Sequence, residues 1–168
     1  VFFAAQGLGA RWGKLSDAPT REPSSEKWTP CATRTTGSLS DAFVSYSSPK
    51  PFAARGVESF LHVLQEKSFE CRTHSDAYGY TRILCGGIDL MVDPLVAPYD
   101  VAALQVLFDE TPHASFTTLQ GQNGPMRFRR GSTVAGANRA LTDQLLMSYR
   151  THLSETAQEY CEHTPELN

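Results

Sequence analysis

The chain has 168 residues, of which 40% are apolar, and a formal net charge of −3 from 15 basic and 18 acidic side chains. The length fits one domain of ordinary size, and the apolar fraction suffices for a packed core and argues against a disordered chain. The charge balance excludes a basic footprint for nucleic acid, and no apolar run approaches the roughly 18–20 residues that span a bilayer.

Residues 1–15 predict a β-hairpin, in which Gly7 and Gly9 form the turn between two short extended pieces. They lack the basic start and the long apolar stretch of a signal peptide, which favours a cytoplasmic protein. The chain opens on Val1, not Met, inside what reads as a strand. We therefore expect the true beginning to be missing, and an organellar targeting peptide could have been lost with it.

The four cysteines, Cys31, Cys71, Cys85 and Cys161, give no sign of a zinc site, because no two of them lie within four residues of each other. An even number of cysteines is weak evidence for disulfides. We expect free, mostly buried thiols in a reducing compartment.

Residues 16–40 are rich in Ser, Thr and Pro, which predicts a linker. Residues 41–168 then alternate between extended and helical patterns. The alternation predicts a layered α/β domain with helices on both faces of one sheet of about five strands. The expected strands are 42–46, 68–72, 88–92, 114–119 and 132–136, and the expected helices are 57–67, 76–85, 98–110 and 138–162.

Asp100 stands where an extended apolar run meets a helix, and its position has two interpretations. The carboxylate can cap free backbone N–H groups at the positive end of the helix. Ligand sites of open α/β sheets also gather beyond the strand ends, near helix N-termini. Because Asp93 lies seven residues earlier, the pair also suits a hard, oxygen-preferring cation and an anionic substrate.

Residues 99–104, Tyr-Asp-Val-Ala-Ala-Leu, resemble the Trp-Asp-x-Ala-Ala-Gly signature of the inositol monophosphatase superfamily. The resemblance extends to the glycine hairpin at 4–13, to the helix and strand of 74–92, and to Ala-Gly-Ala-Asn at 135–138, so it covers residues 4 to about 147. Ser-Asp-Ala-Tyr-Gly-Tyr at 75–80 and Asp-Pro at 93–94 look most like the histidinol-phosphatase branch.

The resemblance implies Mg²⁺-dependent hydrolysis of a small phosphomonoester. Asp100 matches the family's metal-binding Asp, Asp93 matches an acidic position that contacts the organic part of the substrate, and Ser75 and Asp76 match positions lining the same pocket. No catalytic residue is assigned with certainty. The implied fold is the C-terminal half of an αβαβα sugar-phosphatase with a mixed sheet, in which residues 1–15 are the remnant of an N-terminal α+β domain. The family often forms dimers, so a homodimer stays open.

Structural alternatives stay open for each substrate residue. Asp93 and the following proline form a pair that is common in turns, so Asp93 is a candidate strand end. Ser75 or Asp76 is a candidate cap of the helix that follows. Tyr80 is interpreted as a packing residue, and the histidines show no ligand spacing.

Two departures from the family matter. Leu104 replaces a glycine, and residues 111–114, Thr-Pro-His-Ala, replace a glycine-containing turn. The family's Glu-Glu pair and Asp-Pro-x-Asp-Gly-Thr motif do not occur, so we expect the chain to be inactive alone.

The alternatives are a catalytically dead family member acting as a binding or oligomerisation module, and an unrelated α/β domain in which Asp100 is only a helix cap. Histidinol phosphate, inositol phosphates and nucleoside bisphosphates all remain candidate substrates.

Overall fold

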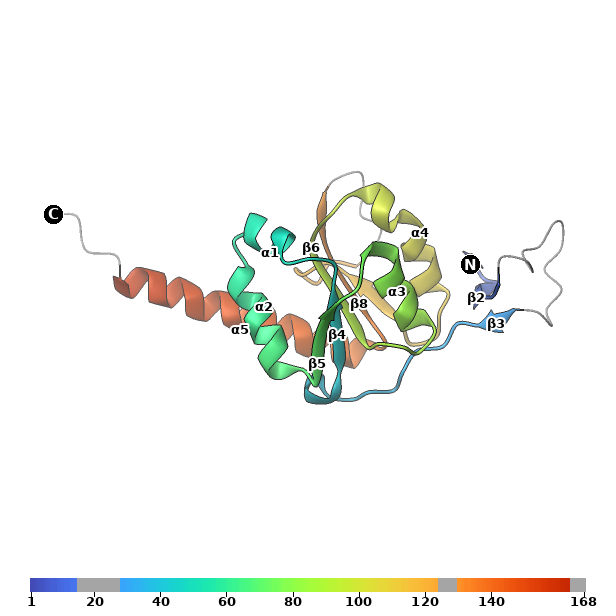
Figure 1. The fold of residues 1–168 in the computed structure, drawn as a ribbon, viewed down its shortest axis with the longest axis horizontal. Coiled ribbons are helices and arrows are strands. Elements are labelled where there is room, and N and C mark those ends of the chain that lie inside the picture. Colours follow the sequence, from blue (N-terminus) through green and yellow to red (C-terminus); the bar gives the residue numbers. More distant parts are fainter. Residues whose placement is uncertain (15–27, 124–129, 164–168) are drawn as a thin grey trace.

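The computed structural model describes residues 1–14, 28–123 and 130–163, with side chains up to residue 156. A five-stranded mixed sheet with the strand order β5-β4-β6-β8-β7 forms its centre (Figure 1). Its strands are β4 (Phe43–Tyr46), β5 (Glu70–Thr73), β6 (Leu90–Val96), β7 (Ser115–Thr117) and β8 (Gly131–Gly136). Strands β5, β4 and β6 are parallel, and β8 runs antiparallel to both β6 and β7. The predicted mixed sheet is therefore confirmed.

Helices cover both faces of this sheet (Figure 1). The long helices are α2 (Glu58–Lys67), α3 (Asp76–Leu84), α4 (Pro98–Asp109) and α5 (Arg139–His163). Leu90 and Val92 of β6 join the core under α2 and α5, whereas Met91 joins the core under α3 and α4. Successive side chains of a strand point to opposite faces, so one buried strand supplies both cores. The layered α/β/α architecture follows from this alternation.

One helix and one strand extension differ from the sequence expectation. No helix was expected between residues 47 and 56, yet α1 (Lys50–Ala54) lies there, with a proline in its first turn. Strand β6 continues through Asp93 and Pro94 to Val96, with a register shift between Asp93 and Val96. The irregularity accommodates a proline that cannot donate to the ladder. The prediction that Asp93 ends a strand was therefore wrong.

A left-handed glycine cap ends α3. Gly86 has a φ of 71°. Its N–H donates to the carbonyl of Ile83 at 3.0 Å, and the N–H of Gly87 donates to the carbonyl of Arg82 at 2.7 Å. These two hydrogen bonds satisfy the last free carbonyls of α3 and turn the chain toward β6.

The predicted N-terminal hairpin is also present, as β1 (Phe2–Ala5) and β2 (Gly9–Trp12). A short third strand, β3 (Thr29–Pro30), pairs with β2 inside the segment expected to be a linker. Residues 16–27 of that linker, and residue 15 before it, lie outside the described residues. The division into a remnant at 1–15, a linker at 16–40 and a domain at 41–168 stays a prediction.

The described cysteines are free thiols, as expected. Cys31 is buried, and Cys71 and Cys85 are half-buried. Burial raises the pKa of the Cys31 thiol to about 11 and that of Cys71 to about 12, so both stay protonated at neutral pH. None of the helices that the structure describes is long and apolar enough to cross a bilayer.

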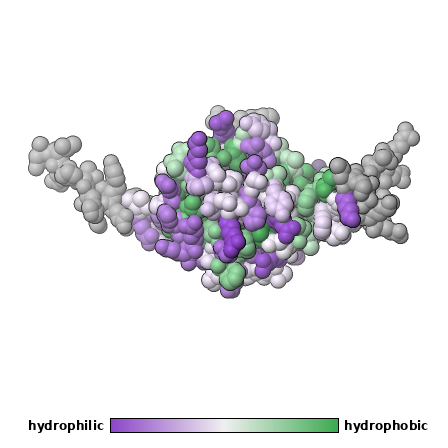
Figure 2. Space-filling view, in the orientation of Figure 1, coloured by the Kyte–Doolittle hydropathy of each residue, from purple (hydrophilic) through white to green (hydrophobic). Residues whose placement is uncertain are grey.

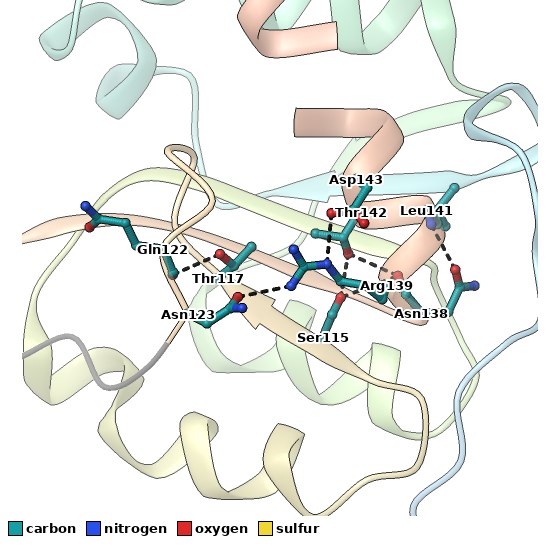
Figure 3. A network of polar contacts seen from close by, with 9 residues as sticks. All are labelled: Ser115, Thr117, Gln122, Asn123, Asn138, Arg139, Leu141, Thr142 and Asp143. Atoms are coloured by element: carbon teal, nitrogen blue, oxygen red, sulfur yellow. Dashed lines mark hydrogen bonds and ion pairs between the residues drawn. The ribbon is translucent and has the colours of Figure 1, made fainter. Parts of the chain in front are cut away.

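A polar network anchors the start of α5 to strand β7 (Figure 3). The side-chain oxygen of Asn138 accepts the N–H of Leu141 at 2.9 Å and caps the helix. The hydroxyl of Thr142 donates to the carbonyl of Asn138 at 3.1 Å and is hydrogen-bonded to the hydroxyl of Ser115. Gly136 leaves the room for these two hydroxyls, because a Cβ there would stand 2.9 Å from the Ser115 hydroxyl oxygen.

Candidate functional site

The candidate site lies at the carboxyl edge of the three parallel strands. In Figure 1, β4 runs toward α1, and β6 runs toward the start of α4 on the same side of the sheet. Ser47 follows β4, Ser75 and Asp76 follow β5, and Asp93 and Asp100 belong to β6 and to the helix after it. Because the carboxyl ends of parallel strands meet at one edge, residues from three separate segments converge there.

Asp100 is an exposed residue in the first turn of α4. Its Oδ2 accepts the backbone N–H of Ala97, the residue at the start of the helix, at 2.8 Å. This bond satisfies a backbone donor at the helix start, and the negative charge suits the positive end of the helix dipole. The capping interpretation of Asp100 is confirmed, and its role as a metal ligand stays a prediction.

Asp93 is nearly fully buried, with 2% of its surface exposed. Its Oδ1 accepts the N–H of Ser47 at 3.0 Å as well as the Ser47 hydroxyl, and its Oδ2 accepts the hydroxyl of Tyr80 at 2.7 Å. Tyr80 is also hydrogen-bonded to the hydroxyl of Thr133. Both carboxylate oxygens of Asp93 are therefore occupied by groups of the protein itself.

Burial shifts the pKa values of Asp93 and Tyr80. It raises the pKa of Asp93 above its ordinary value, although the hydrogen bonds from Ser47 and Tyr80 oppose the shift. Burial and the charge of Asp93 together raise the pKa of Tyr80 well above its ordinary value. Tyr80 is therefore a neutral hydrogen-bond donor at any physiological pH.

Ser75 and Asp76 are both exposed at the start of α3. Ser75 is the N-cap residue, directly before the first residue of α3, but its side chain makes no capping hydrogen bond. The capping alternative was therefore wrong for Ser75. Asp76 has a φ of 40°, a left-handed conformation that is strained for a residue with a side chain. Strain of this kind clusters at functional sites, which makes Asp76 a candidate contact.

The three predicted carboxylates influence one another through the buried pair. The charge of Asp76 contributes to the raised pKa of Asp93, and the charge of Asp100 contributes to the raised pKa of Tyr80. The structure therefore brings Asp76, Asp93 and Asp100 into one electrostatic neighbourhood. Asp93 lies under this surface, whereas the other two are exposed.

Sequence reasoning missed the partners of Asp93. Tyr80 was interpreted as a packing residue, which its burial and its contact with Phe116 confirm, but it also donates to Asp93. Its spacing of four residues from Asp76 places both on one helix face, and this was the available signal. Ser47 and Thr133 carried no signal, because strand pairing alone brings them to Asp93.

Comparison with known proteins gives two kinds of similarity. No protein-family model matches the chain. It is 31% identical over 109 residues to the histidinol-phosphatase of Streptomyces coelicolor and 28% identical over 108 residues to that of Mycobacterium tuberculosis. Each match covers 64% of this chain but only 39% and 40% of the respective relatives.

The solved structures that resemble the chain include inositol monophosphatases. The enzyme from Zymomonas mobilis matches with a TM-score of 0.67 and 21% identity, over 85% of this chain and 53% of its own. Inositol monophosphatase II from Staphylococcus aureus matches with a TM-score of 0.70 and 17% identity, over 98% of this chain and 56% of its own. The chain is thus similar in sequence to part of these histidinol-phosphatases and shares its fold with part of these inositol monophosphatases.

The superfamily resemblance implies Mg²⁺, and the described residues fit that ion only in part. Mg²⁺ needs a near-octahedral shell of oxygen ligands. No group of three or more His, Cys, Asp or Glu side chains in the described part of the chain is placed to hold a metal ion. Asp100 offers one exposed carboxylate, and Asp93 is engaged with Ser47 and Tyr80. These residues by themselves do not make a magnesium site.

The turn at residues 111–114, where the superfamily has glycines, keeps a left-handed residue without using glycine. His113 adopts a φ of 66° there. The hydroxyl of Thr111 donates to the carbonyl of Leu107 at 2.7 Å and holds the preceding helix end. Leu104, which stands in place of the other glycine, is buried in the core under α4. The two departures therefore leave the fold intact.

Proposed function

We propose that this chain is the C-terminal part of a phosphoric monoester hydrolase of the inositol monophosphatase type, which acts on a small phosphomonoester with Mg²⁺. The observation that carries the proposal is the placement of Asp100. A negatively charged side chain is held at a helix start, beyond the carboxyl end of β6, where α/β folds bind their ligands. The similarity to two histidinol-phosphatases supports the reaction class.

The chain supplies one ligand to the metal site in this proposal, and segments outside this sequence supply the others. The matched region amounts to 39% and 40% of the two relatives, which agrees with such a division. When bound, Mg²⁺ polarises the phosphoryl group and lowers the pKa of an attacking water. Because no group of three or more possible metal ligands comes together among the described residues, we expect the chain to be inactive alone.

In this proposal, the residues of this chain hold the Asp100 carboxylate in place and shape the substrate pocket. The N–H of Ala97 fixes the Asp100 carboxylate in place at 2.8 Å. Asp93 ties the loop after β4 to α3 through Ser47 and Tyr80, so it makes the floor of the proposed substrate pocket rigid. Ser75 and Asp76 stand exposed above that floor, where their side chains are free to meet the organic part of a substrate.

Asp76, Asp93 and Asp100 form an acidic edge of the sheet. Histidinol phosphate is the substrate that this acidic edge suits best, and inositol phosphates are the alternative. Its amine is cationic at neutral pH and its imidazole becomes cationic below about pH 6.5, so the exposed Asp76 carboxylate with Asp93 beneath it suits these groups. Both sequence relatives carry the name histidinol-phosphatase. An inositol phosphate has hydroxyls in place of cationic groups, so it gains less from these charges.

A catalytically dead family member that acts as a binding or oligomerisation module is the second candidate. It is favoured by the finding that Asp100 already has a structural task as a helix cap. The lack of a three-ligand group among the described residues also fits it. The two candidates differ in whether the longer protein encoded around this sequence binds Mg²⁺.

The decisive experiment measures phosphate release from histidinol phosphate and from inositol 1-phosphate, with and without Mg²⁺. The 168-residue chain and the longer protein encoded with the sequence upstream of Val1 are compared. We expect background rates for the chain alone and a Mg²⁺-dependent rate for the longer protein. Asp100→Asn keeps an acceptor for Ala97 but removes the charge, so it lowers that rate by about 100-fold or more.

Asp109→Asn, which removes an exposed carboxylate from the other end of the same helix, is the matched control and should leave the rate unchanged. A longer protein that binds no Mg²⁺ and releases no phosphate would establish the dead-module candidate. Full activity of Asp100→Asn would remove the proposed metal ligand.

A further inference from the structure

A cavity lies on the opposite face of the sheet from the acidic edge. Its volume is about 350 Å³, and it opens between the end of α1, strand β6, the segments that flank β7 and β8, and helix α5. Its polar lining comes from Arg55, Gln120, Arg130, Ser132 and Tyr149. A volume of this size falls in the range of small-molecule sites.

The alternation of β6 separates this cavity from the proposed phosphatase site. Asp93 points to α3, where it meets Tyr80, whereas its neighbour Pro94 lines the cavity together with Tyr149 of α5. Neighbouring side chains of a strand lie on opposite faces of the sheet. The cavity and the carboxylates of the acidic edge are therefore on different sides of the same strand.

Positive charge gathers at the cavity, although the chain as a whole has a net charge of −3. Arg55 and Arg130 line it, and none of the described residues that line it carries a carboxylate. Within the described ranges, neither guanidinium forms an ion pair. A third guanidinium lies close by, since Nη2 of Arg150 stands 3.0 Å from where a Cβ on Gly121 would be, next to Gln120.

Neutral donors complete the lining. The hydroxyl of Ser132 accepts the N–H of Leu119 at 3.0 Å and is 3.2 Å from Oε1 of Gln120, which holds the segment after β7 in place. Tyr149 keeps its proton at neutral pH, because burial raises its pKa and the charge of Arg55 only partly opposes the shift. The lining thus offers two guanidiniums, a phenol and an amide, without an opposing negative charge.

We propose that this cavity binds a small phosphorylated molecule through Arg55 and Arg130. A guanidinium presents a planar fork of N–H donors that fits two phosphate oxygens, and charge-assisted bonds of this kind are about twice as strong as neutral ones. Two such forks at one cavity select a ligand with at least two negative charges. The apolar wall formed by Val57, Pro94 and Leu119 takes the uncharged part of the ligand. This binding is independent of the proposed phosphatase reaction.

Isothermal titration calorimetry of the 168-residue chain with pyrophosphate tests the proposal, in a metal-free buffer that contains EDTA. We expect saturable binding that weakens as salt is added. Arg55→Gln combined with Arg130→Gln should weaken the affinity by roughly tenfold or more. Arg72→Gln is the matched control, since Arg72 is an exposed arginine on β5 that pairs with Glu70 at 3.0 Å. It should bind as the unaltered chain does.

Two further variants keep the result interpretable. Arg55→Lys with Arg130→Lys preserves the charge but removes the fork, and should bind with intermediate affinity. Asp100→Asn should bind pyrophosphate normally, because Asp100 lies at the other site. Unchanged affinity of the double glutamine variant, an equal loss in Arg72→Gln, or no binding by the unaltered chain at millimolar pyrophosphate would overturn the proposal.

Discussion

At the scale of single residues, Asp93 shows how burial changes the meaning of a carboxylate. It stands in the middle of β6, and the protein itself occupies both of its oxygens through Ser47 and Tyr80. Such a group stabilises its surroundings through hydrogen bonds, yet its negative charge is costly where water is excluded. Its direct contribution to ligand binding is therefore limited to the charge that it projects toward Asp76 and Asp100.

The raised pKa of Asp93 predicts a pH-dependent stability. Between its ordinary value of 3.8 and its higher value in the fold, the folded chain holds a proton that the unfolded chain has released. The free energy of unfolding therefore falls as pH rises through that range. Asp93→Asn cannot titrate, so it should gain stability relative to the unaltered chain over the same range. Urea unfolding at a series of pH values measures the difference.

Asp109→Asn controls for the loss of any one carboxylate, since Asp109 is exposed. Its stability should follow that of the unaltered chain at every pH in the series. A constant difference between Asp93→Asn and the unaltered chain across the series would show that Asp93 does not titrate in this range.

At the scale of elements, carboxylates organise both ends of α4. Asp100 caps its start through Ala97. Glu110 follows its end and accepts the N–H groups of Gly7 and Gly9, each at 2.8 Å, while its own carbonyl accepts the N–H of Ala10 at 3.1 Å. The N-terminal hairpin is therefore attached to the sheet domain mainly through the end of one helix.

Substitution of Glu110 should loosen the hairpin. In Glu110→Ala the amides of Gly7 and Gly9 lose their acceptor and should exchange hydrogen faster, while the amides of β4 and β6 should not change. Backbone hydrogen bonds lower the pKa of Glu110 below 4.5, so in the unaltered chain the attachment is present above that value and is lost as pH falls through the folded pKa. Hydrogen exchange followed by mass spectrometry reports both effects. Asp109→Ala should leave the hairpin protected.

The junction of β7, β8 and α5 predicts a sharp cost for one added methyl group. At Gly136 a Cβ would press on the hydroxyls of Thr142 and Ser115 and stand 3.2 Å from Leu90 (Figure 3 shows the two hydroxyls). Gly136→Ala should therefore lower the free energy of unfolding by about 1–3 kcal/mol. Gly37→Ala, where nothing lies within 4 Å, should change it by less than about 0.5 kcal/mol. Equal midpoints in urea for both variants would refute the packing argument.

At the scale of the whole molecule, the N-terminal hairpin and the start of α4 each expose a large apolar side chain. Leu8 of the hairpin is 75% exposed, and Tyr99 at the start of α4 is 79% exposed. Elsewhere the visible surface mixes polar and apolar side chains (Figure 2). Exposed apolar side chains of this size favour association when nothing covers them.

We therefore expect the 168-residue chain to self-associate as its concentration rises. Leu8→Ser combined with Tyr99→Ser should shift it toward a monomer without lowering its melting temperature, because both side chains are exposed. Size-exclusion chromatography with light scattering measures the mass. Phe69→Ser, which changes a 74% exposed residue beside β5, is the control and should leave the association unchanged. A chain that is monomeric at every concentration would contradict the expectation.

Local patterns decided most of the architecture. The apolar periodicities of residues 57–67 and 138–162 correspond to α2 and α5, and the glycine pair at 86–87 ends α3. These features depend on neighbours a few residues apart, so they are visible in the chain itself. The helix at Lys50–Ala54 was missed because two prolines read as a break, although a proline in the first turn is compatible with a helix.

The candidate site could be inferred in part from the local sequence, and in part only from the tertiary structure. Asp100 could be singled out from its place before a helix and from the family signature, and the structure added its bond to Ala97. The environment of Asp93 could not be inferred, because Tyr80 and Ser47 stand 13 and 46 residues away along the chain. Only the pairing of β4 with β6 and the packing of α3 bring them together. The arginine cavity arises in the same way, from segments that meet only after the sheet has formed.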